Sequence, residues 1–289
     1  MIQTILERAV AAGRPAAERG AAASYIPELG KVDKRLLGAC VFTRDGGRFS
    51  AGDTGVRFSI QSISKVISLA AALELCGFDT VFSQVGMEPS GEAFNSLVEL
   101  EPTGSRPSNP MINSGAIAVD GYLEPKLSFA EMLSFTRKLC MDDGIVLDEA
   151  VYHSEMSHIS RNRAIAYLLE NQGVLQGDVE RTLDFYVRMC SLSVTAESLA
   201  GLGLLLAEGG VSPATGERLL SPDTVRVVKT IMLTCGMYDG SGAFAVRVGL
   251  PSKSGVGGGI LSVADRQHMG IGIFGPALDA KGNSIAGEA

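Results

Sequence analysis

The chain carries strand-like segments near both of its ends, and they enclose a long helical middle. Towards the N-terminus, Gly38–Thr43 and Arg48–Asp53 flank Arg44–Gly47, in which Asp-Gly supplies the turn signal of a β-hairpin. Towards the C-terminus, Phe244–Val248 and Met269–Phe274 are short apolar runs bounded by glycine, a pattern typical of strands. Because strands must pair within a sheet, we expect one sheet built from both ends of the chain.

Helical patterns dominate the middle of the chain, beginning with the apolar run Ile63–Leu75, which predicts a buried helix. We therefore predict an α/β (α+β) fold of two parts. Residues 1–60 and 193–289 are expected to form a sheet domain, and residues 61–192 an inserted helical domain. In such a layout the active site is expected at the seam between the two parts.

Three further helices are predicted outside this block. Met1–Arg8 reads as a short amphipathic helix, and Ala196–Glu208 reads as an apolar one. Ser221 and Pro222 have the residue types of an N-cap and a first helical position, so a helix is predicted over Asp223–Met232.

The bulk composition excludes several classes of protein. Hydrophobic residues make up 46% and charged residues 20% of the 289, which are values of an ordinary globular chain. There are 25 basic and 32 acidic residues, a formal charge of −7 without a basic block, so we expect no nucleic-acid partner. Glu7 and Arg8 interrupt the segment where a signal peptide needs its apolar run, and the longest apolar runs are too short for a bilayer. We therefore expect a cytoplasmic protein with no membrane partner.

Cysteine and histidine are too dispersed to predict a metal or thiol site. The five cysteines contain no Cys-x-x-Cys pair, so we expect small buried hydrophobes in a reducing compartment. His153 and His158 are five residues apart, off the four-residue spacing that places two side chains on one helix face, and His268 is distant in sequence. We expect no metal and no cofactor.

Ser62 and Lys65 form a Ser-x-x-Lys pair where a strand-like stretch gives way to the helix predicted over Ile63–Leu75. Residues three apart lie on one helix face, and this arrangement recurs for serine nucleophiles that have no histidine. Ser64 points about 100° away from Lys65 around the helix. Ser68 lies a turn deeper, where a serine usually bonds to a backbone carbonyl. Ser62, at the exposed first turn beside free backbone amides, is therefore the predicted nucleophile.

Lys65 can accept a proton from Ser62 only when its amine is neutral, and burial among apolar neighbours lowers the pKa of an amine. Because Ser-x-x-Lys also occurs by chance in many helices, the pair needs a second element. Lys253-Ser254-Gly255 matches the Lys-[Ser/Thr]-Gly signature of the same enzyme class.

Attack on a carbonyl also needs an oxyanion hole, commonly two backbone amides. The amide of Ser62 is one candidate, and the second is expected from Lys253–Gly259, where glycines let the backbone approach a substrate. A phosphate-cradling loop is the alternative for this glycine run. The run lacks the Gly-Lys-Ser/Thr ending of a P-loop, however, and it does not fit Gly-x-Gly-x-x-Gly.

Six blocks, spread in order over nearly the whole chain, resemble the serine-dependent glutaminase family. They are Tyr25–Leu29, Gln61–Lys65, Val85–Gly91, Asn109–Ile117, Cys235–Asp239 and Lys253–Gly259. The resemblance implies the serine β-lactamase/DD-peptidase-like fold, in which an antiparallel sheet is flanked by helices and carries an inserted all-helical domain. It also implies L-glutamine as the substrate and a homodimer or homotetramer as the assembly.

By this resemblance, Ser62 attacks the side-chain amide of L-glutamine and releases ammonia, after which water frees L-glutamate from the acyl-enzyme. Lys65 corresponds to the base that activates Ser62. Tyr25 and Tyr238 match tyrosines that line the site of the family, and a phenol can relay protons to the ammonia or from the water. Which tyrosine does which stays open. The amides of Ser62 and Val256 match the oxyanion hole.

Four further positions match the contacts of the family with the α-amino and α-carboxylate groups of the substrate: Asn113, Glu155, Asn162 and Tyr186. A carboxylate such as Glu155 suits an ammonium, whereas amides and phenols can donate to a carboxylate. The residue patterns alone allow simpler roles. Asn113 could be a turn residue, Glu155 and Asn162 could cap a helix through Ala164–Leu169, and Tyr186 could belong to the core.

Two other functions stay open at this level. A penicillin-interacting hydrolase or transpeptidase of the same fold would need export, and the chain has no Tyr-x-Asn; its Ser-x-Asn candidate, Ser160-Arg161-Asn162, matches glutaminases better. A non-catalytic amino-acid-binding protein would have no need for a nucleophile such as Ser62 with a base such as Lys65.

Overall fold

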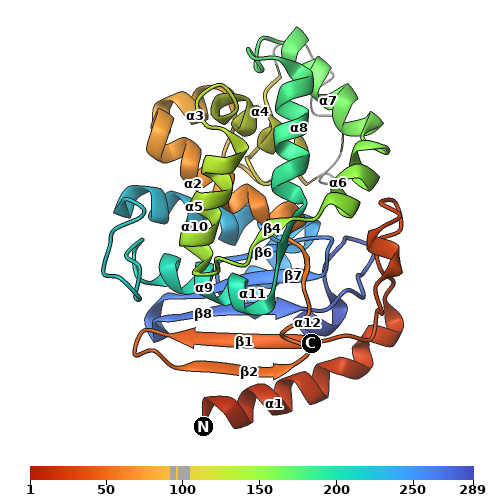
Figure 1. Ribbon diagram of the computed structural model, residues 1–289, viewed down its shortest axis with the longest axis vertical. Coiled ribbons are helices and arrows are strands. Elements are labelled where there is room, and N and C mark those ends of the chain that lie inside the picture. The colour runs from red at the N-terminus through yellow and green to blue at the C-terminus, as the bar shows by residue number, and fades with distance from the viewer. Residues whose placement is uncertain (92–95, 97–104) are drawn as a thin grey trace.

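The computed structural model describes residues 1–91, 96 and 105–289, and its larger sheet joins the two ends of the chain. The strands of this antiparallel sheet follow the order β2-β1-β8-β7-β6. Their bounds are β1 Gly38–Thr43, β2 Arg48–Gly52, β6 Ser252–Ser254, β7 Gly259–Ala264 and β8 Met269–Phe274. β1 pairs with β8 from Gly38 opposite Phe274 to Thr43 opposite Met269. The prediction of one sheet assembled from both ends is confirmed (Figure 1).

Helices cover both faces of this sheet. α1 (Ile2–Gly13), which is longer than the sequence pattern predicts, packs on the face to which Val41 of β1 points. α9 (Ala196–Ala207) packs on the opposite face, where the adjacent residue Phe42 joins the main core. Successive side chains of a strand point to opposite faces, so β1 contributes to two apolar clusters at once.

α9 lies close to β8 because two alternate residues of β8 are glycines. A Cβ added at Gly270 would lie 2.0 Å from the backbone nitrogen of Leu204. A Cβ added at Gly272 would lie 1.9 Å from the backbone oxygen of Ala196. No side chain fits at either position, so the glycine pattern of β8 determines how near the helix and sheet backbones approach.

The remaining helices lie mainly on the α9 side of the sheet (Figure 1). α2 is the innermost of them, and most of its residues are buried because α4 and α10 pack against it. Their bounds are α2 Ser64–Cys76, α3 Phe78–Gln84, α4 Asn113–Leu123, α5 Phe129–Cys140, α6 Glu149–Met156, α7 Ser160–Asn171, α8 Val179–Cys190, α10 Pro222–Cys235, α11 Ser241–Arg247 and α12 Ile285–Glu288.

A second, small sheet ties the start of the helical block to its end. Its strands are β3 (Phe58–Ser59), β5 (Leu192–Val194) and β4 (Val146–Leu147), with β5 in the centre. The N–H of Ile60 extends the pairing by donating to the carbonyl of Leu192 at 2.8 Å. The division into a sheet domain and a helical domain stays a proposal, and this small sheet lies at the proposed boundary.

The strand predicted at Phe244–Val248 is wrong, because Ser241–Arg247 form helix α11. A short apolar run carries too little periodicity to distinguish a strand from a helix. Most of α11 is exposed, with Val246 at 88%, so these apolar residues are not the buried strand that the sequence suggests. The edge strand of the sheet begins later, at Ser252.

The other predicted elements named above are confirmed, with small changes at their ends. The hairpin, α9 and β8 lie where the sequence places them. α10 begins at Pro222, and the N–H of Thr224 donates to Oγ of the cap residue Ser221 at 3.2 Å.

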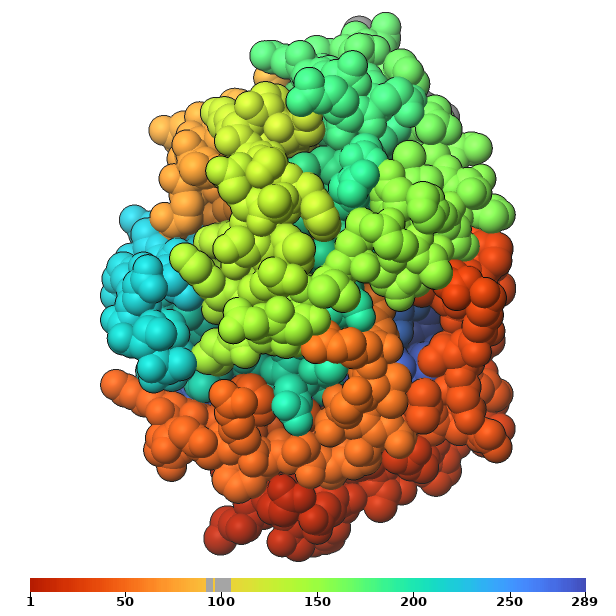
Figure 2. Space-filling model, viewed as in Figure 1, coloured from red at the N-terminus to blue at the C-terminus, as the bar shows by residue number. Residues whose placement is uncertain are grey.

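Figure 2 shows one face of the molecule with a hollow, in which blue C-terminal residues are visible between orange N-terminal residues and the green helical part. A cavity of about 140 Å³ is lined by residues from these same three parts, among them Arg57, Asp148 and Gly257. Within residues 1–91, 96 and 105–289, no helix combines the length and the apolar character that crossing a membrane requires.

Candidate active site

Ser62 and Lys65 lie together at the start of α2. Ser62 belongs to a 3₁₀ turn, Gln61–Ile63, that leads directly into the helix, and Lys65 is in the first turn of α2. Lys65 Nζ donates a hydrogen bond to Ser62 Oγ at 3.2 Å. The sequence predicts Ser62 at an exposed helical turn, but the residue is only 6% exposed because it lies where the helices meet the sheet. The pair is therefore a buried one.

Asn113, at the start of α4, holds the amine of Lys65 from the other side. Lys65 Nζ donates to Asn113 Oδ1 at 2.7 Å, and Asn113 Nδ2 donates in turn to Asn162 Oδ1 at 3.0 Å. Burial lowers the pKa of Lys65 to about 8, although Cys190 and Glu155 oppose this shift. A substantial fraction of Lys65 is therefore neutral near pH 8 and able to accept a proton.

Glu155 on α6 brings a second buried charge into the site. Gln61 Nε2 donates to Glu155 Oε2 at 3.2 Å and lies 3.4 Å from the carbonyl oxygen of Cys190. Burial raises the pKa of Glu155 to about 7, while Gln61 and Lys65 hold it lower than burial alone would. Because Glu155 and Asn162 face Gln61 and Asn113, neither caps the helix that follows; α7 begins at Ser160.

Most of the predicted site residues line one small cavity. It has a volume of about 90 Å³ and is lined by residues of the turn before α2, of α4, of the segment from α6 to α8 and of the loop before β1. Its lining residues are Tyr25, Gln61, Ser62, Asn113, Glu155, His158, Arg161, Asn162, Tyr186 and Cys190. The cavity thus combines a serine hydroxyl, a carboxylate and several amide and phenol groups.

The two tyrosines of this cavity differ in exposure. Tyr186 is 3% exposed, and burial raises the pKa of its phenol well above 10. Tyr25 is 54% exposed as a residue, yet desolvation raises the pKa of its phenol well above 10, with Tyr238 and Glu155 adding to the effect. Tyr25 can be exposed as a residue and still have a desolvated phenol if its hydroxyl end reaches into the cavity while the rest of the side chain faces solvent. We infer this orientation for Tyr25.

Tyr238 approaches Ser62 from the C-terminal part of the chain. Burial raises the pKa of Tyr238, and hydrogen bonds with Ser62 and with the backbone of Val256 oppose this shift. Its ring centroid lies 4.5 Å from Nζ of Lys253 on β6. Lys253 is fully buried and donates to the carbonyl of Ser254 at 2.6 Å, and burial together with the neighbouring Lys65 lowers its pKa well below 10.5. Lys253 therefore adds a second buried amine to the site.

The glycine run after β6 packs against the chain that leads to Ser62. A Cβ added at Gly257 would lie 2.3 Å from the backbone oxygen of Ser59, and one at Gly255 would lie 2.8 Å from that of Ile60. Only glycine allows this approach, which sets Val256 close to the start of α2.

Asp120 on α4 is a charged neighbour of the site that the sequence analysis missed. It is 2% exposed, and its Oδ1 has no hydrogen-bond partner among the described residues. Burial raises the pKa of Asp120 to about 7, while a hydrogen bond with Ser68 and the charge of Lys65 lower it. The effect of Ser68 on this pKa indicates that its side chain lies next to Asp120. The signal was an aspartate seven residues after Asn113 in an otherwise apolar helix, because that spacing returns to the same face.

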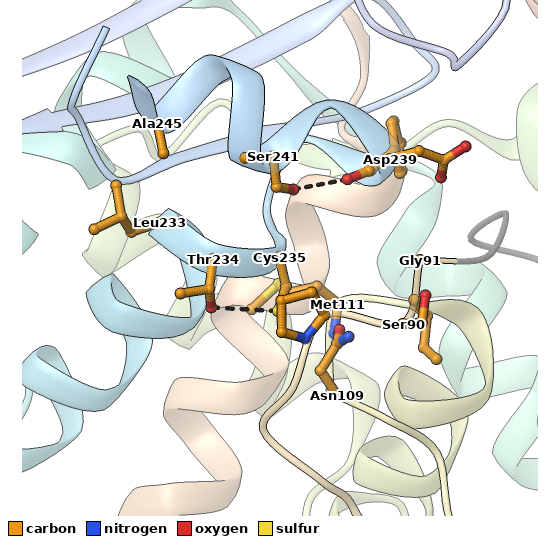
Figure 3. Close-up of a pocket in the computed structure, with 14 residues that line it drawn as sticks. Ser90, Gly91, Asn109, Met111, Leu233, Thr234, Cys235, Asp239, Ser241 and Ala245 are labelled. Carbon is orange, nitrogen blue, oxygen red and sulfur yellow. Dashed lines mark hydrogen bonds between the residues drawn. The ribbon is translucent and has the colours of Figure 1, made fainter. Parts of the chain in front are cut away.

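A larger cavity of about 390 Å³ is lined by Tyr238 together with residues such as Asn109, Cys235 and Asp239 (Figure 3). Two of its polar side chains are bonded within the protein. Asn109 Nδ2 donates to the carbonyl of Glu88 at 2.8 Å, and Ser241 Oγ donates to the carbonyl of Tyr238 at 2.7 Å. Elsewhere among the described residues, His, Cys, Asp and Glu form no group of three that could hold a metal ion.

A buried serine–amine pair at a helix start, together with Lys-Ser-Gly at the end of a strand, is typical of hydrolases with a β-lactamase-like fold. Comparison with known protein families and solved structures identifies which family of hydrolases the chain belongs to. The family model described as Glutaminase matches residues 20–289, so the chain belongs to the glutaminase family.

Individual relatives agree over nearly the full length. The chain is 50% identical to glutaminase 2 of Clostridium perfringens over 290 residues, which cover 99% of this chain and 95% of that protein. A probable glutaminase from Bacillus subtilis, solved in complex with 6-diazo-5-oxo-L-norleucine, is 39% identical with a TM-score of 0.89, covering 99% of this chain and 91% of that one. The covalent complex between the Bacillus subtilis glutaminase YbgJ and 5-oxo-L-norleucine is 40% identical with the same TM-score, covering 99% and 94%.

Proposed function

We propose that the chain hydrolyses L-glutamine to L-glutamate and ammonia through an acyl-enzyme on Ser62, with Lys65 as the base. It is an amidohydrolase by membership of the glutaminase family. The observation that carries the mechanism is the 3.2 Å contact between Lys65 Nζ and Ser62 Oγ in a buried site, where the pKa of the amine is lowered to about 8. His158 lines the same cavity, but its Nδ1 lies 2.8 Å from the carbonyl oxygen of Ser154, whereas Lys65 contacts Ser62 directly, so the amine is the base we assign to the hydroxyl.

The first half of the reaction forms the acyl-enzyme. Neutral Lys65 accepts the proton of Ser62, and Oγ attacks the amide carbon of the glutamine side chain. The backbone amides of Ser62 and Val256 would stabilise the resulting oxyanion. The carbon–nitrogen bond then breaks, and the leaving nitrogen takes up a proton through a tyrosine hydroxyl and departs as ammonia. Tyr238 is the better placed of the two tyrosines, because its phenol is close enough to Ser62 for that residue to lower the pKa of Tyr238 against the effect of burial.

The second half consumes one water. The water attacks the ester carbonyl and gives a proton to the neutral amine of Lys65, which returns that proton to Ser62 Oγ as the carbon–oxygen bond to Ser62 breaks. The products are free glutamate and the starting enzyme. Because the free energy of each step depends on a buried amine that gains and loses one proton, the rate is expected to follow the titration of Lys65.

The pocket supports an L-amino acid as the substrate. Glu155 offers a carboxylate for the α-ammonium group, and the amides of Asn113 and Asn162 with the phenol of Tyr186 offer donors for the α-carboxylate. The neighbouring structures with 6-diazo-5-oxo-L-norleucine, a glutamine analogue, support the same choice. We further propose that the protein works in the cytoplasm, without nucleic acid or membrane partners, as a homodimer or homotetramer. Light scattering of the purified chain tests the assembly.

The decisive experiment compares the wild type with Ser62→Ala. Ammonia release is measured with glutamine and with asparagine, ring opening of the β-lactam nitrocefin is followed by its absorbance, and glutamine binding is measured by calorimetry. We expect turnover of glutamine by the wild type only, with glutamine binding retained in Ser62→Ala. Equal turnover by both proteins would refute the serine mechanism, and preferential turnover of nitrocefin would refute glutamine as the substrate.

A further inference from the structure

The backbone of Tyr238 is strained at the point where its side chain enters the site. Its φ angle is +51°, a left-handed conformation that a bulky residue rarely adopts. Such a conformation is unfavourable for a residue with a large side chain and persists only where the surroundings impose it. The contacts that impose it therefore also decide where the Tyr238 hydroxyl lies.

One side of the turn around Tyr238 provides little of this support. Tyr238 and Asp239 help to line the cavity of about 390 Å³, together with Ser241 and Ala245 of the following helix (Figure 3). Ser241 closes the turn on itself, because its Oγ accepts from the N–H of Met237 at 3.0 Å and donates to the carbonyl of Tyr238 at 2.7 Å. These bonds shape the turn locally but do not attach it to the rest of the protein.

The opposite side of the turn is attached to the loop Asp279–Asn283. Asn283 is 1% exposed, and its Nδ2 donates to the carbonyl of Met237 at 3.2 Å. Lys281 Nζ donates to the carbonyl of Asp239 at 3.3 Å. The bond from Asn283 is the buried one of the two, so solvent competes with it least.

The same loop also contacts the ring. A Cβ added at Gly282 would lie 3.5 Å from Cε2 of Tyr238 and 3.3 Å from Cγ1 of Val256. Asp279 keeps the loop in this shape, because its Oδ1 accepts from the N–H groups of Lys281 and Asn283 at 2.9 Å each. The loop thus reaches both the tyrosine and the residue proposed for the oxyanion hole.

We propose that Asn283 is a positioning residue that holds the strained turn of Tyr238 and thereby keeps the Tyr238 hydroxyl beside Ser62. This inference rests on the proposed proton relay by Tyr238. Without the bond to the Met237 carbonyl, the turn can relax towards negative φ, and the ring rotates with the Cα–Cβ bond. A displacement of about 1 Å at a reacting group lowers a rate by up to about a hundredfold.

The test is a double-mutant cycle. Asn283→Ala and Asn283→Asp are made in the wild type and in Tyr238→Phe, and kcat for glutamine is measured in each. Asn283→Asp keeps the shape of the side chain but has no N–H to donate, so it serves if Asn283→Ala folds poorly. We expect kcat to fall between about tenfold and a hundredfold in the wild-type background, and less than about twofold in Tyr238→Phe.

Ser284→Ala is the matched control. Ser284 is the next residue of the same loop and is equally buried, but its Oγ accepts from the N–H of Gly287 in α12 at 3.1 Å. We expect this variant to lower the melting temperature without changing kcat. An equal fold loss from Asn283→Ala in both backgrounds would overturn the inference alone. Full activity of Tyr238→Phe would overturn the role of Tyr238 and the inference with it, while inactivity of Ser62→Ala would still support the nucleophile.

Discussion

Replacing Asp120 with asparagine is expected to change the stability of the fold relative to the wild type, and this difference should favour the variant more at alkaline pH than at acidic pH. In the folded protein the pKa of Asp120 is raised to about 7 from its ordinary value of 3.8, because the carboxyl is buried. Between these two pH values the unfolded chain releases the proton and the folded chain keeps it. The free energy of unfolding of the wild type therefore falls as the pH rises through this window.

The size of the effect follows from the two pKa values. One pKa unit corresponds to about 1.4 kcal/mol, so burial of Asp120 costs the fold roughly 4 kcal/mol at pH 8, where the carboxyl is ionised. At pH 5, where the folded protein keeps the proton that the unfolded chain releases, the cost is roughly 1.5 kcal/mol. Asparagine cannot ionise, but it brings a buried amide donor, which costs about 1–3 kcal/mol at every pH if it finds no acceptor. This constant cost cancels when two pH values are compared. We expect the free energy of unfolding of Asp120→Asn, measured relative to that of the wild type, to be roughly 3 kcal/mol higher at pH 8 than at pH 5.

Urea unfolding followed by circular dichroism at pH 5 and pH 8 measures the effect. The same exchange at the exposed residue Asp143 controls for the loss of an acidic charge. A change in stability that is equal at both pH values would refute the argument that Asp120 is desolvated in the fold.

The same substitution is expected to act on catalysis. Asp120, Glu155 and Cys190 raise the pKa of Lys65 against the effect of burial, so removing one negative charge should lower it. Lysine must be neutral to act as a base, and kcat/KM of the wild type should rise with pH around a midpoint of about 8. In Asp120→Asn this rise should occur at lower pH, with a lower plateau because the base is weaker. A midpoint that stays in place would contradict the electrostatic link between Asp120 and Lys65.

Two further substitutions probe the pocket and the fold. Glu155→Gln keeps the shape of the side chain but removes the charge proposed to bind the ammonium of glutamine. KM should therefore rise between about tenfold and a hundredfold, the equivalent of a charged hydrogen bond. Initial rates across glutamine concentrations measure KM, and an unchanged KM would argue against this contact. Gly272→Ala should destabilise the fold by about 1–3 kcal/mol or prevent folding, because the new Cβ would meet the backbone of α9 at 1.9 Å. Thermal unfolding tests this, with Gly242→Ala as the control because a Cβ there has nothing within 4 Å, and equal melting temperatures for the two variants would disprove the packing argument.

Local signals in the sequence were sufficient for much of the fold. The Asp-Gly turn predicts the hairpin of β1 and β2, and Ser221-Pro222 predicts the start of α10, because turn and cap chemistry act within a few residues. The prediction of a strand at Phe244–Val248 is wrong because strand formation is not decided by such local signals. The structure of this run depends on whether a neighbouring strand pairs with it, and five apolar residues do not carry that information.

Only part of the candidate active site could likewise be predicted from local sequence signals. Ser62 and Lys65 are three residues apart, so their contact follows from helix geometry and could be predicted directly. Asn113, Glu155 and Tyr238 come from α4, α6 and the turn after α10, and the sequence pointed to them only through the resemblance to a family. Asp120 had no such support and was missed, because its proximity to Lys65 depends on how α2 packs against α4.

The sequence by itself therefore determined the kinds of chemical group available, a hydroxyl beside an amine at the start of a buried helix, together with the strands that frame it. Tertiary structure decided the properties of those groups. The lowered pKa of Lys65 and the raised pKa of Glu155 and Asp120 arise mainly from burial, and burial exists only once segments distant in sequence have excluded water around them. The strained turn of Tyr238 is likewise held by a loop more than forty residues further along the chain.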